Sequence, residues 1–200
     1  MKNRKTEIIE ATLELASRNG LGTVSMQQIA DRVGITKASL YNHFSSRDEI
    51  VEAMYEQLRS ASREHADAGG IDYERLAKGR SLQEILSEAV SSYRKMIRDP
   101  KMTQFYSIIM NERSISPAAA EIMVKETERM IAATKTMFYA LQVKGIADFH
   151  DADAAAFSFA MAVHGILEYE LDLEHTGMKK NQRMMKQYLE EFSRIYGKGE

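Results

Sequence analysis

Apolar side chains recur along most of this 200-residue chain at spacings of three and four positions. That period places them on one face of an α-helix, whereas the alternation typical of a half-buried strand is nowhere convincing. The clearest stripe lies between residues 82 and 98 and stops before Pro100. The pattern predicts an all-α protein of about nine helices.

Helix-ending residues bound the expected elements. Gly20 and Gly145 each follow an apolar stripe, where glycine adopts the left-handed conformation that ends a helix. The predicted helices cover residues 6–19, 26–33, 37–44, 47–68, 82–98, 102–113, 117–143, 152–174 and 181–196. The helix at 102–113 is apolar nearly all round and is expected to be buried. The polar segment 69–79 is the expected boundary region, and a short turn at 73–77 stays open.

Residues 23–50 contain two short capped helices joined by a tight turn. Ser25 and Gln28 form a capping box, in which each side chain satisfies a backbone N–H group at a helix start. Gly34 ends this helix, and Thr36 is a suitable N-cap for the next. Two helices joined by about three residues form a helix-turn-helix unit.

The second of these helices exposes side chains that can donate to phosphate oxygens or reach base edges in the major groove. The candidate DNA-contacting residues are Ser25, Thr36, Lys37, Ala38, Ser39, Tyr41, Asn42, His43 and Arg47. Taken alone, Tyr41 is more typical of a packed aromatic residue and His43 of a side chain that bonds to a helix end. Asn42 is as typical of a solvated side chain as of a DNA contact. The surrounding pattern favours DNA contact for Tyr41 and His43.

Two further features belong to the same unit. Ser46 and Glu49 form a second capping box that starts a helix at Arg47, whose guanidinium suits a phosphate anchor. Small Ala30 lies where the two short helices would approach most closely, so a bulky residue there is expected to disrupt the unit.

The segment GLGTVSMQQIADRVGITKASLYNHFSSRDEI, residues 20–50, resembles the N-terminal domain of the tetracycline repressor (TetR) family of bacterial transcription regulators. The likeness covers roughly residues 5–55 and is most specific in the signature at 38–44. Ala38 stands where many relatives have glycine, and Arg47 where lysine is frequent. Beyond this domain only the length and the helical pattern are similar, so no ligand residue carries over.

The resemblance implies a DNA-binding domain at 1–50 and a ligand-binding and dimerisation domain at 51–200, with the helix from residue 47 bridging both. In the TetR family the third helix usually contacts bases, and the tyrosine and histidine of the signature contact phosphates. The resemblance thereby implies base contacts from Ala38, Ser39 and Asn42 and phosphate contacts from Tyr41 and His43, with Lys37 and Arg47 as anchors.

Charge is divided unevenly along the chain, whose formal net charge is −2. Residues 1–50 contain seven Lys and Arg against six Asp and Glu, and the remainder contains 20 against 23. The asymmetry is small, so DNA affinity would depend on a few placed contacts and on Lys2, Arg4 and Lys5 as a basic arm.

The composition bounds the cellular setting. Cysteine is absent, so disulfides and thiolate metal sites are excluded. The longest apolar region, 154–167, is too short for a membrane helix and is interrupted by Ser158 and His164. Because the N-terminal residues also lack the apolar core of a signal peptide, we expect a cytoplasmic protein without membrane contact.

Small residues crowd the helix expected at 152–174. They are Ala154, Ala155, Ala156, Ala160, Ala162 and Gly165. Together with the helix at 181–196, this surface predicts a four-helix interface across a two-fold axis and hence a homodimer, as the resemblance also implies. The alternative is that small residues let this helix pack inside its own subunit.

Ten of the thirteen methionines lie beyond residue 70, which suits a core that adapts to varied apolar ligands. The candidate lining residues of a pocket for a small lipophilic effector are Tyr93, Phe105, Tyr106, Ile109, Met123, Met130, Phe157, Met161, His164 and Glu168. They share the inward stripes of the helices expected between residues 82 and 174. Ordinary core packing is the alternative for each of them, and His164 suits a core or interface histidine equally.

Catalysis and metal binding find little support. The acidic run at 148–153 lies between two helices, which favours capping over a metal site, and no cofactor is expected. Nucleotide-binding, metalloprotease and hydrolase motifs are absent, so we do not expect an enzyme.

The leading hypothesis is a repressor that leaves a palindromic, double-stranded DNA operator when an effector binds. The alternatives are a regulator or nucleoid-associated factor without an effector, and an enzyme or carrier that retained the motif.

Overall fold

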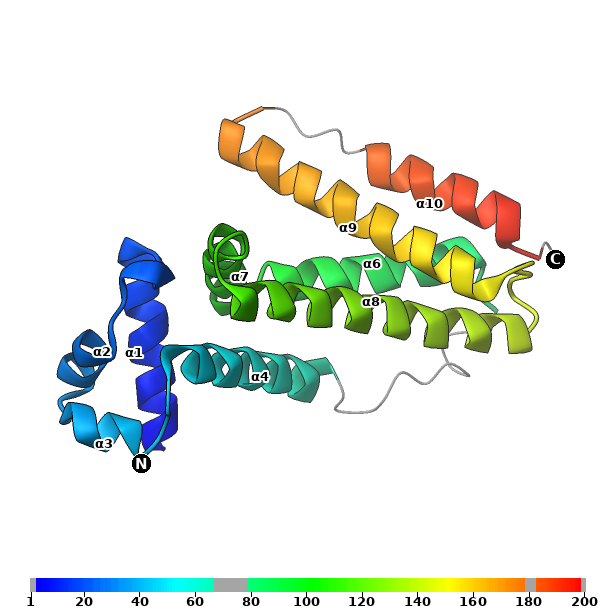
Figure 1. Ribbon diagram of the computed structural model, residues 1–200. Coiled ribbons are helices and arrows are strands. Elements are labelled where there is room, and N and C mark those ends of the chain that lie inside the picture. Colours follow the sequence, from blue (N-terminus) through cyan, green and yellow to red (C-terminus); the bar gives the residue numbers. More distant parts are fainter. Residues whose placement is uncertain (1–2, 67–78, 179–182, 199–200) are drawn as a thin grey trace. The chain divides into compact units, whose positions relative to one another are not determined.

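A computed structural model describes residues 3–66, 79–178 and 183–198 (Figure 1). Within these ranges the chain forms nine α-helices, which confirms the all-α prediction. The helices are α1 (Arg4–Asn19), α2 (Met26–Val33), α3 (Lys37–Tyr41), α4 (Arg47–Ala66), α6 (Leu82–Ile97), α7 (Pro100–Glu112), α8 (Pro117–Val143), α9 (Ala152–Thr176) and α10 (Arg183–Tyr196). A 3-10 turn, η1 (Leu21–Thr23), joins α1 to α2.

The bounds differ from the predicted ones most at α3, which ends at Tyr41 rather than at residue 44, and they also differ at Pro100. This residue both follows α6 and opens α7, where Asp99 accepts hydrogen bonds from the Lys101 and Met102 N–H groups. The expectation that this helix is buried as a whole is wrong, because only the face with Met102, Phe105, Ile108 and Ile109 is buried. The predicted turn at 73–77, and the segment around it, lie outside the described residues.

The chain divides into two compact units. The first unit comprises Met1–Ala68 and Met96–Glu126, and the second comprises Gly69–Lys95 and Thr127–Glu200. The largest fully buried side chains of the first unit are Ile8, Ile29, Leu40, Ile50, Tyr55, Met102, Phe105 and Ile109. Because α7 and the start of α8 complete this core, the first unit extends well beyond residue 50.

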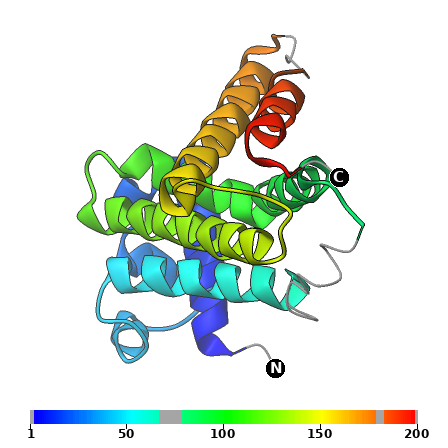
Figure 2. The same cartoon turned by 90° about the vertical axis from the view of Figure 1, so that its right-hand side faces the viewer.

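Aromatic side chains from α8, α9, α10 and the loop between α8 and α9 form the core at one end of the second unit. They are Phe138, Phe149, Phe159, Tyr188, Phe192 and Tyr196. The backbone closes the same end, because the Asp148 N–H group donates to the Tyr196 oxygen at 2.8 Å and the Lys198 N–H group to the Ile146 oxygen at 2.9 Å. α10 packs along α9 in both views (Figure 1, Figure 2).

Membrane insertion has no suitable element in the part of the chain that the structure describes. None of its helices combines the length and the apolar character needed to span a bilayer.

Candidate nucleic-acid interface

The helix-turn-helix forms as its capping residues predict. The Gln28 N–H group donates to Ser25 Oγ at 3.2 Å, and Gln28 Oε1 accepts from the Ser25 N–H group at 2.8 Å. Gly34 ends α2 with φ of 75° and ψ of 35°, a left-handed conformation that a side chain would disfavour. These local contacts set the length of the turn before α3.

α3 is short and is held by two buried side chains. Thr36 caps it, since Thr36 Oγ1 accepts from the Ser39 N–H group at 3.1 Å. Leu40 is fully buried and Phe44 is 2% exposed, so the helix is fixed on one side. Tyr41, one residue after Leu40, is 46% exposed. The packing therefore turns the predicted DNA-reading side of α3 to the surface.

The predicted DNA-contacting residues all lie in the first unit. Six of them are exposed, namely Ser25, Thr36, Lys37, Ala38, Tyr41 and Asn42, and three are half-buried, namely Ser39, His43 and Arg47. Lys5 joins this group, because its Nζ lies 5.3 Å from the centre of the Phe44 ring. Arg4 and Lys5 lie in the first turn of α1 rather than in the predicted basic arm, and this cation–π contact holds Lys5 beside the segment that follows α3.

The second capping box differs by one residue from its prediction. Ser46 Oγ accepts from the Glu49 N–H group at 3.1 Å, as expected. The Glu49 carboxylate, however, accepts from the Ser45 N–H group at 2.6 Å and from the Ser45 hydroxyl at 2.8 Å, rather than from Ser46. These hydrogen bonds to the charged form hold the pKa of Glu49 below its ordinary value.

Arg47, the first residue of α4, binds backbone oxygens in and just after the η1 turn. Its Nη1 donates to the carbonyl oxygens of Leu21 at 2.9 Å, Gly22 at 3.1 Å and Val24 at 3.2 Å. Arg47 thus stabilises the turn that precedes α2, a role that sequence reasoning missed. Its predicted phosphate contact would have to use its other nitrogens and remains a prediction.

The predicted effector-lining residues divide between the two units. Phe105, Tyr106, Ile109 and Met123 belong to the first unit, and Tyr93, Met130, Phe157, Met161, His164 and Glu168 belong to the second. Phe105 and Ile109 are fully buried in the core of the first unit. Phe157 and Met161 are 53% and 39% exposed, so their assignment to an inward stripe is wrong. Their apolar character suggested the core, but α9 is apolar on more than one face.

Three predicted residues do meet in the second unit. His164 Nδ1 lies 3.5 Å from the Tyr93 hydroxyl, and His164 Nε2 lies 3.2 Å from Glu168 Oε1. Nearby on the same two helices, Arg94 Nη2 lies 2.9 Å from an oxygen of Glu170, whose side chain is buried. The second unit therefore contains a polar cluster between α6 and α9, of which sequence reasoning found only part.

Glu126 makes a second polar cluster, in the first unit. Its carboxylate accepts from the Tyr55 hydroxyl at 2.6 Å and from the Tyr106 hydroxyl at 2.5 Å. One side chain of α8 thereby joins α4 to α7. Sequence reasoning noted Glu126 only as a possible partner of a cationic ligand.

An open hollow of about 260 Å³ lies between α1, α4 and α7 in the first unit, with Ile9, Leu13, Met54 and Leu58 among its lining residues. Groups of three or more His, Asp or Glu that could hold a metal ion do not occur among the described residues. Asp151 in the acidic run caps α9 instead, accepting from the Ala154 N–H group at 2.9 Å.

Two regions that together cover most of the chain match known domain families. Residues 8–54 match the family of bacterial regulatory proteins called tetR. Residues 84–197, more than half of the chain, match the C-terminal domain of AefR-like transcriptional repressors. The chain belongs to the TetR family of bacterial regulatory proteins. This membership confirms the resemblance and agrees with the prediction that the TetR-family chain is not an enzyme.

Named relatives of this TetR-family chain include two repressors. The transcriptional repressor KstR of Rhodococcus jostii is 32% identical over 138 residues, which cover 68% of this chain and 61% of that protein. KstR of Mycolicibacterium smegmatis is 33% identical over 79 residues, covering 38% of this chain and 39% of the relative. The chain thus spans less than two thirds of either relative in these matches.

Solved structures share the fold over nearly the whole chain. A putative TetR-family regulator from Mesorhizobium loti has a TM-score of 0.71 at 19% identity, covering 98% of this chain and 97% of that one. The complex of SmeT with triclosan has a TM-score of 0.69 at 16% identity, covering 98% and 93%. At these identities the likeness shows a common fold.

Proposed function

We propose that this TetR-family protein is a DNA-binding transcriptional regulator, and specifically a repressor that a small molecule releases from a palindromic operator. The observation that carries the proposal is the exposed side of α3, which buried Leu40 and Phe44 hold in place. Such a short, rigid helix with exposed polar residues suits the major groove of DNA. The relatives named as repressors support the sign of the regulation.

The contacts follow from the position of each residue on α3 and around it. Ala38, Ser39 and Asn42 would face base edges, with the Ala38 methyl group suited to a thymine methyl. Tyr41 and His43 would donate to phosphates. Ser25, Thr36, Lys37 and Arg47 flank them at helix starts, where N–H groups and positive charge favour phosphate.

A homodimer would present two such helices. Phe157 and Met161 form an exposed apolar stripe on α9, and Gly165 lies on the same helix with open space around the position of a side chain. Three of the small residues, Ala155, Ala156 and Ala160, are buried within the second unit instead. The exposed residues of α9, together with α10, are the proposed interface. Half-sites about 34–36 Å apart would then be read together.

The effector part of the proposal rests on the second unit. The cluster of Tyr93, His164 and Glu168 offers hydrogen-bond donors and acceptors, a few of which fix the orientation of a ligand in a typical ligand site. SmeT, which shares the fold, has been solved with triclosan. A regulator without an effector is the second candidate, favoured by the full burial of Phe105 and Ile109, which leaves them as core.

Selection of binding sites from random duplex DNA tests the DNA-binding function. We expect wild-type protein to enrich a palindrome with salt-sensitive affinity. Tyr41→Phe, which removes one phosphate donor, should lower affinity for that palindrome about threefold to tenfold. Tyr139→Phe removes an exposed hydroxyl of α8 in the second unit and should leave affinity unchanged. Folded wild-type protein that enriches no sequence would refute the proposal.

A screen of small lipophilic compounds tests the effector. A compound that raises the melting temperature of the free protein and releases the selected DNA would support it, because linkage requires tighter binding to the off-DNA form. If no compound changes either quantity, the regulator without an effector becomes the better reading.

A further inference from the structure

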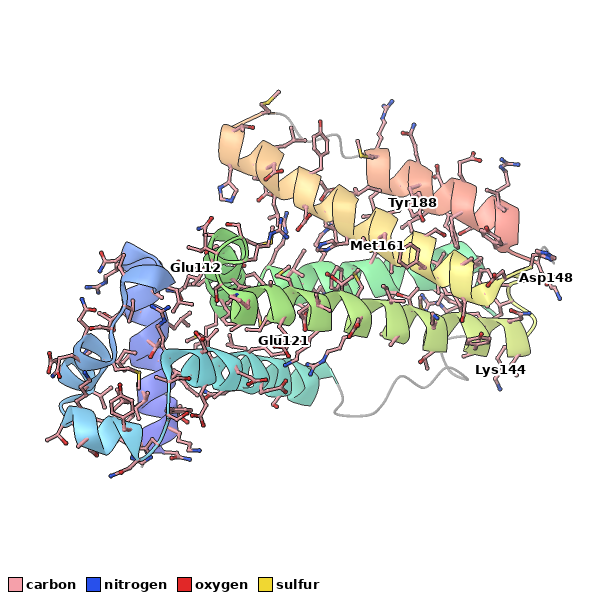
Figure 3. All side chains as sticks on the ribbon, viewed as in Figure 1. Glu112, Glu121, Lys144, Asp148, Met161 and Tyr188 are labelled. Atoms are coloured by element: carbon pink, nitrogen blue, oxygen red, sulfur yellow. The ribbon has the colours of Figure 1, made fainter. Side chains whose placement is uncertain are left out.

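Two opposite charges hold a single residue, Gly22, in the η1 turn. The Gly22 N–H group donates to Glu112 Oε1 at 2.9 Å, while the Gly22 carbonyl oxygen accepts from Arg47 Nη1 at 3.1 Å. Arg47 comes from the start of α4, and Glu112 is the last residue of α7 (Figure 3). The turn before α2 is thus clamped from two helices of the same unit.

Neither charge suits the helix that carries it. The C-terminal end of a helix favours positive charge and its N-terminal end favours negative charge. Glu112 ends α7 and Arg47 opens α4, so each stands at the unfavourable end. The contacts with η1 supply a reason for both residue types that the helices themselves do not.

The clamped turn sets where α2 begins. Leu21 and Val24 are 4% and 3% exposed and anchor the turn on the core, and Ser25, the next residue, caps α2. The Glu112 carboxylate lies directly against Gly22, because a Cβ atom at Gly22 would lie 3.4 Å from both of its oxygens. A shift of the turn would therefore move the start of α2 and, through the short Gly34 turn, α3.

We propose that Glu112 is a positioning residue for operator binding, acting from α7 through Gly22 on the helix-turn-helix. The inference rests on the proposed DNA-binding function. Glu112 carries a negative charge and would repel phosphate, so any favourable effect on DNA affinity has to come from orientation. Arg47 is the complementary half of the clamp, which gives it a second task besides its proposed phosphate contact.

The decisive comparison is Glu112→Ala with Glu121→Ala. Both substitutions remove one negative charge, and Glu121 is an exposed residue of α8 whose contact is an ion pair with Lys125 (Figure 3). Loss of negative charge alone should raise DNA affinity slightly in both variants. We expect Glu112→Ala to bind the selected operator about tenfold more weakly, as the loss of a charge-assisted hydrogen bond implies. Glu121→Ala should bind at least as well as wild type.

Affinity for non-operator DNA separates positioning from general damage. A misplaced helix-turn-helix should lose operator affinity while non-specific affinity is kept, whereas a partly unfolded protein should lose both in proportion. Glu112→Gln keeps a neutral acceptor and should fall between wild type and Glu112→Ala. Amide exchange at Gly22 should speed up in the same order.

The outcomes separate the two proposals. If wild type binds no operator, the DNA-binding function fails, and this inference with it. If wild type binds and Glu112→Ala keeps its ratio of operator to non-specific affinity, only the positioning role is overturned. A Gly22 amide that exchanges equally fast in wild type and Glu112→Ala would also overturn it.

Discussion

Capping side chains define the ends of several helices, and each acts on backbone groups a few residues away. Ser25, Thr36 and Asp151 were predictable as caps and are confirmed as such. The roles of Glu112 and Glu126 were not predictable, because their partners are distant in the sequence. Gly22 lies 90 residues from Glu112, and Tyr55 lies 71 residues from Glu126. A sequence pattern predicts that a carboxylate on a helix is solvated unless its partner is known.

Tyr188 on α10 makes the free energy of unfolding depend on pH in the alkaline range. Burial, with the neighbouring Tyr196 as a lesser cause, raises the pKa of Tyr188 to about 12. Between its ordinary value near 10 and that value, the unfolded chain loses the proton while the folded chain keeps it. Unfolding is therefore favoured as pH rises through this window.

Tyr188→Phe should remove this dependence. We expect the stability difference between Tyr188→Phe and wild type, measured by chemical denaturation, to be constant below pH 9 and to shift in favour of the variant above about pH 10. Parallel curves up to pH 12 would show that Tyr188 ionises freely in the folded protein.

Helices in this chain are defined by their stripes, but a stripe does not say which partner it meets. α2 and α3 form as predicted because caps and turn residues specify both ends. α9 shows the opposite case, since Ala156 and Ala160 face the protomer core while Phe157 and Met161 stay exposed. The same apolar composition occurs on both faces, so Phe157 and Met161 were wrongly assigned to the inward face.

Ala30 should tolerate little added bulk, because it is fully buried in α2. Ala30→Leu adds three carbon atoms there and should lower the free energy of unfolding by about 2 kcal/mol. Operator binding should be lost at temperatures where the variant still shows helical circular dichroism. Ala132→Leu, at an exposed position of α8, is the matched control and should behave as wild type. An Ala30→Leu protein with wild-type melting and binding would contradict the packing argument.

Two compact units make up the molecule, and the family places both in one regulator. The expected boundary at residue 50 cuts through the core of the first unit, which Phe105 and Ile109 of α7 complete. The division into a DNA-binding domain at 1–50 and a ligand-binding and dimerisation domain at 51–200 remains a functional proposal, since DNA binding and ligand binding need not follow the packing units. The proposed dimer would join two protomers, so that two α3 helices would bind the two half-sites of a palindromic operator.

Met161 tests the proposed dimer interface on α9 (Figure 3). Met161→Glu would bury two unpaired charges in a symmetric dimer, so we expect its dissociation constant to rise at least about a hundredfold. Sedimentation should show monomers at micromolar concentration, and operator affinity should fall because one α3 reads few bases. Val124→Glu, at a similarly exposed apolar position of α8, should stay dimeric. An unchanged dimer in Met161→Glu would move the interface elsewhere.

The sequence by itself determined the helical class, the helix-turn-helix and the candidate DNA-reading residues. These depend on caps, turns and side-chain periods that act over a few neighbouring residues. The tertiary structure decided which apolar face of α9 is exposed and which distant groups meet, such as Glu112 with Gly22 and Glu126 with Tyr55 and Tyr106. A stripe records that a face avoids water, but only packing in three dimensions selects its partner.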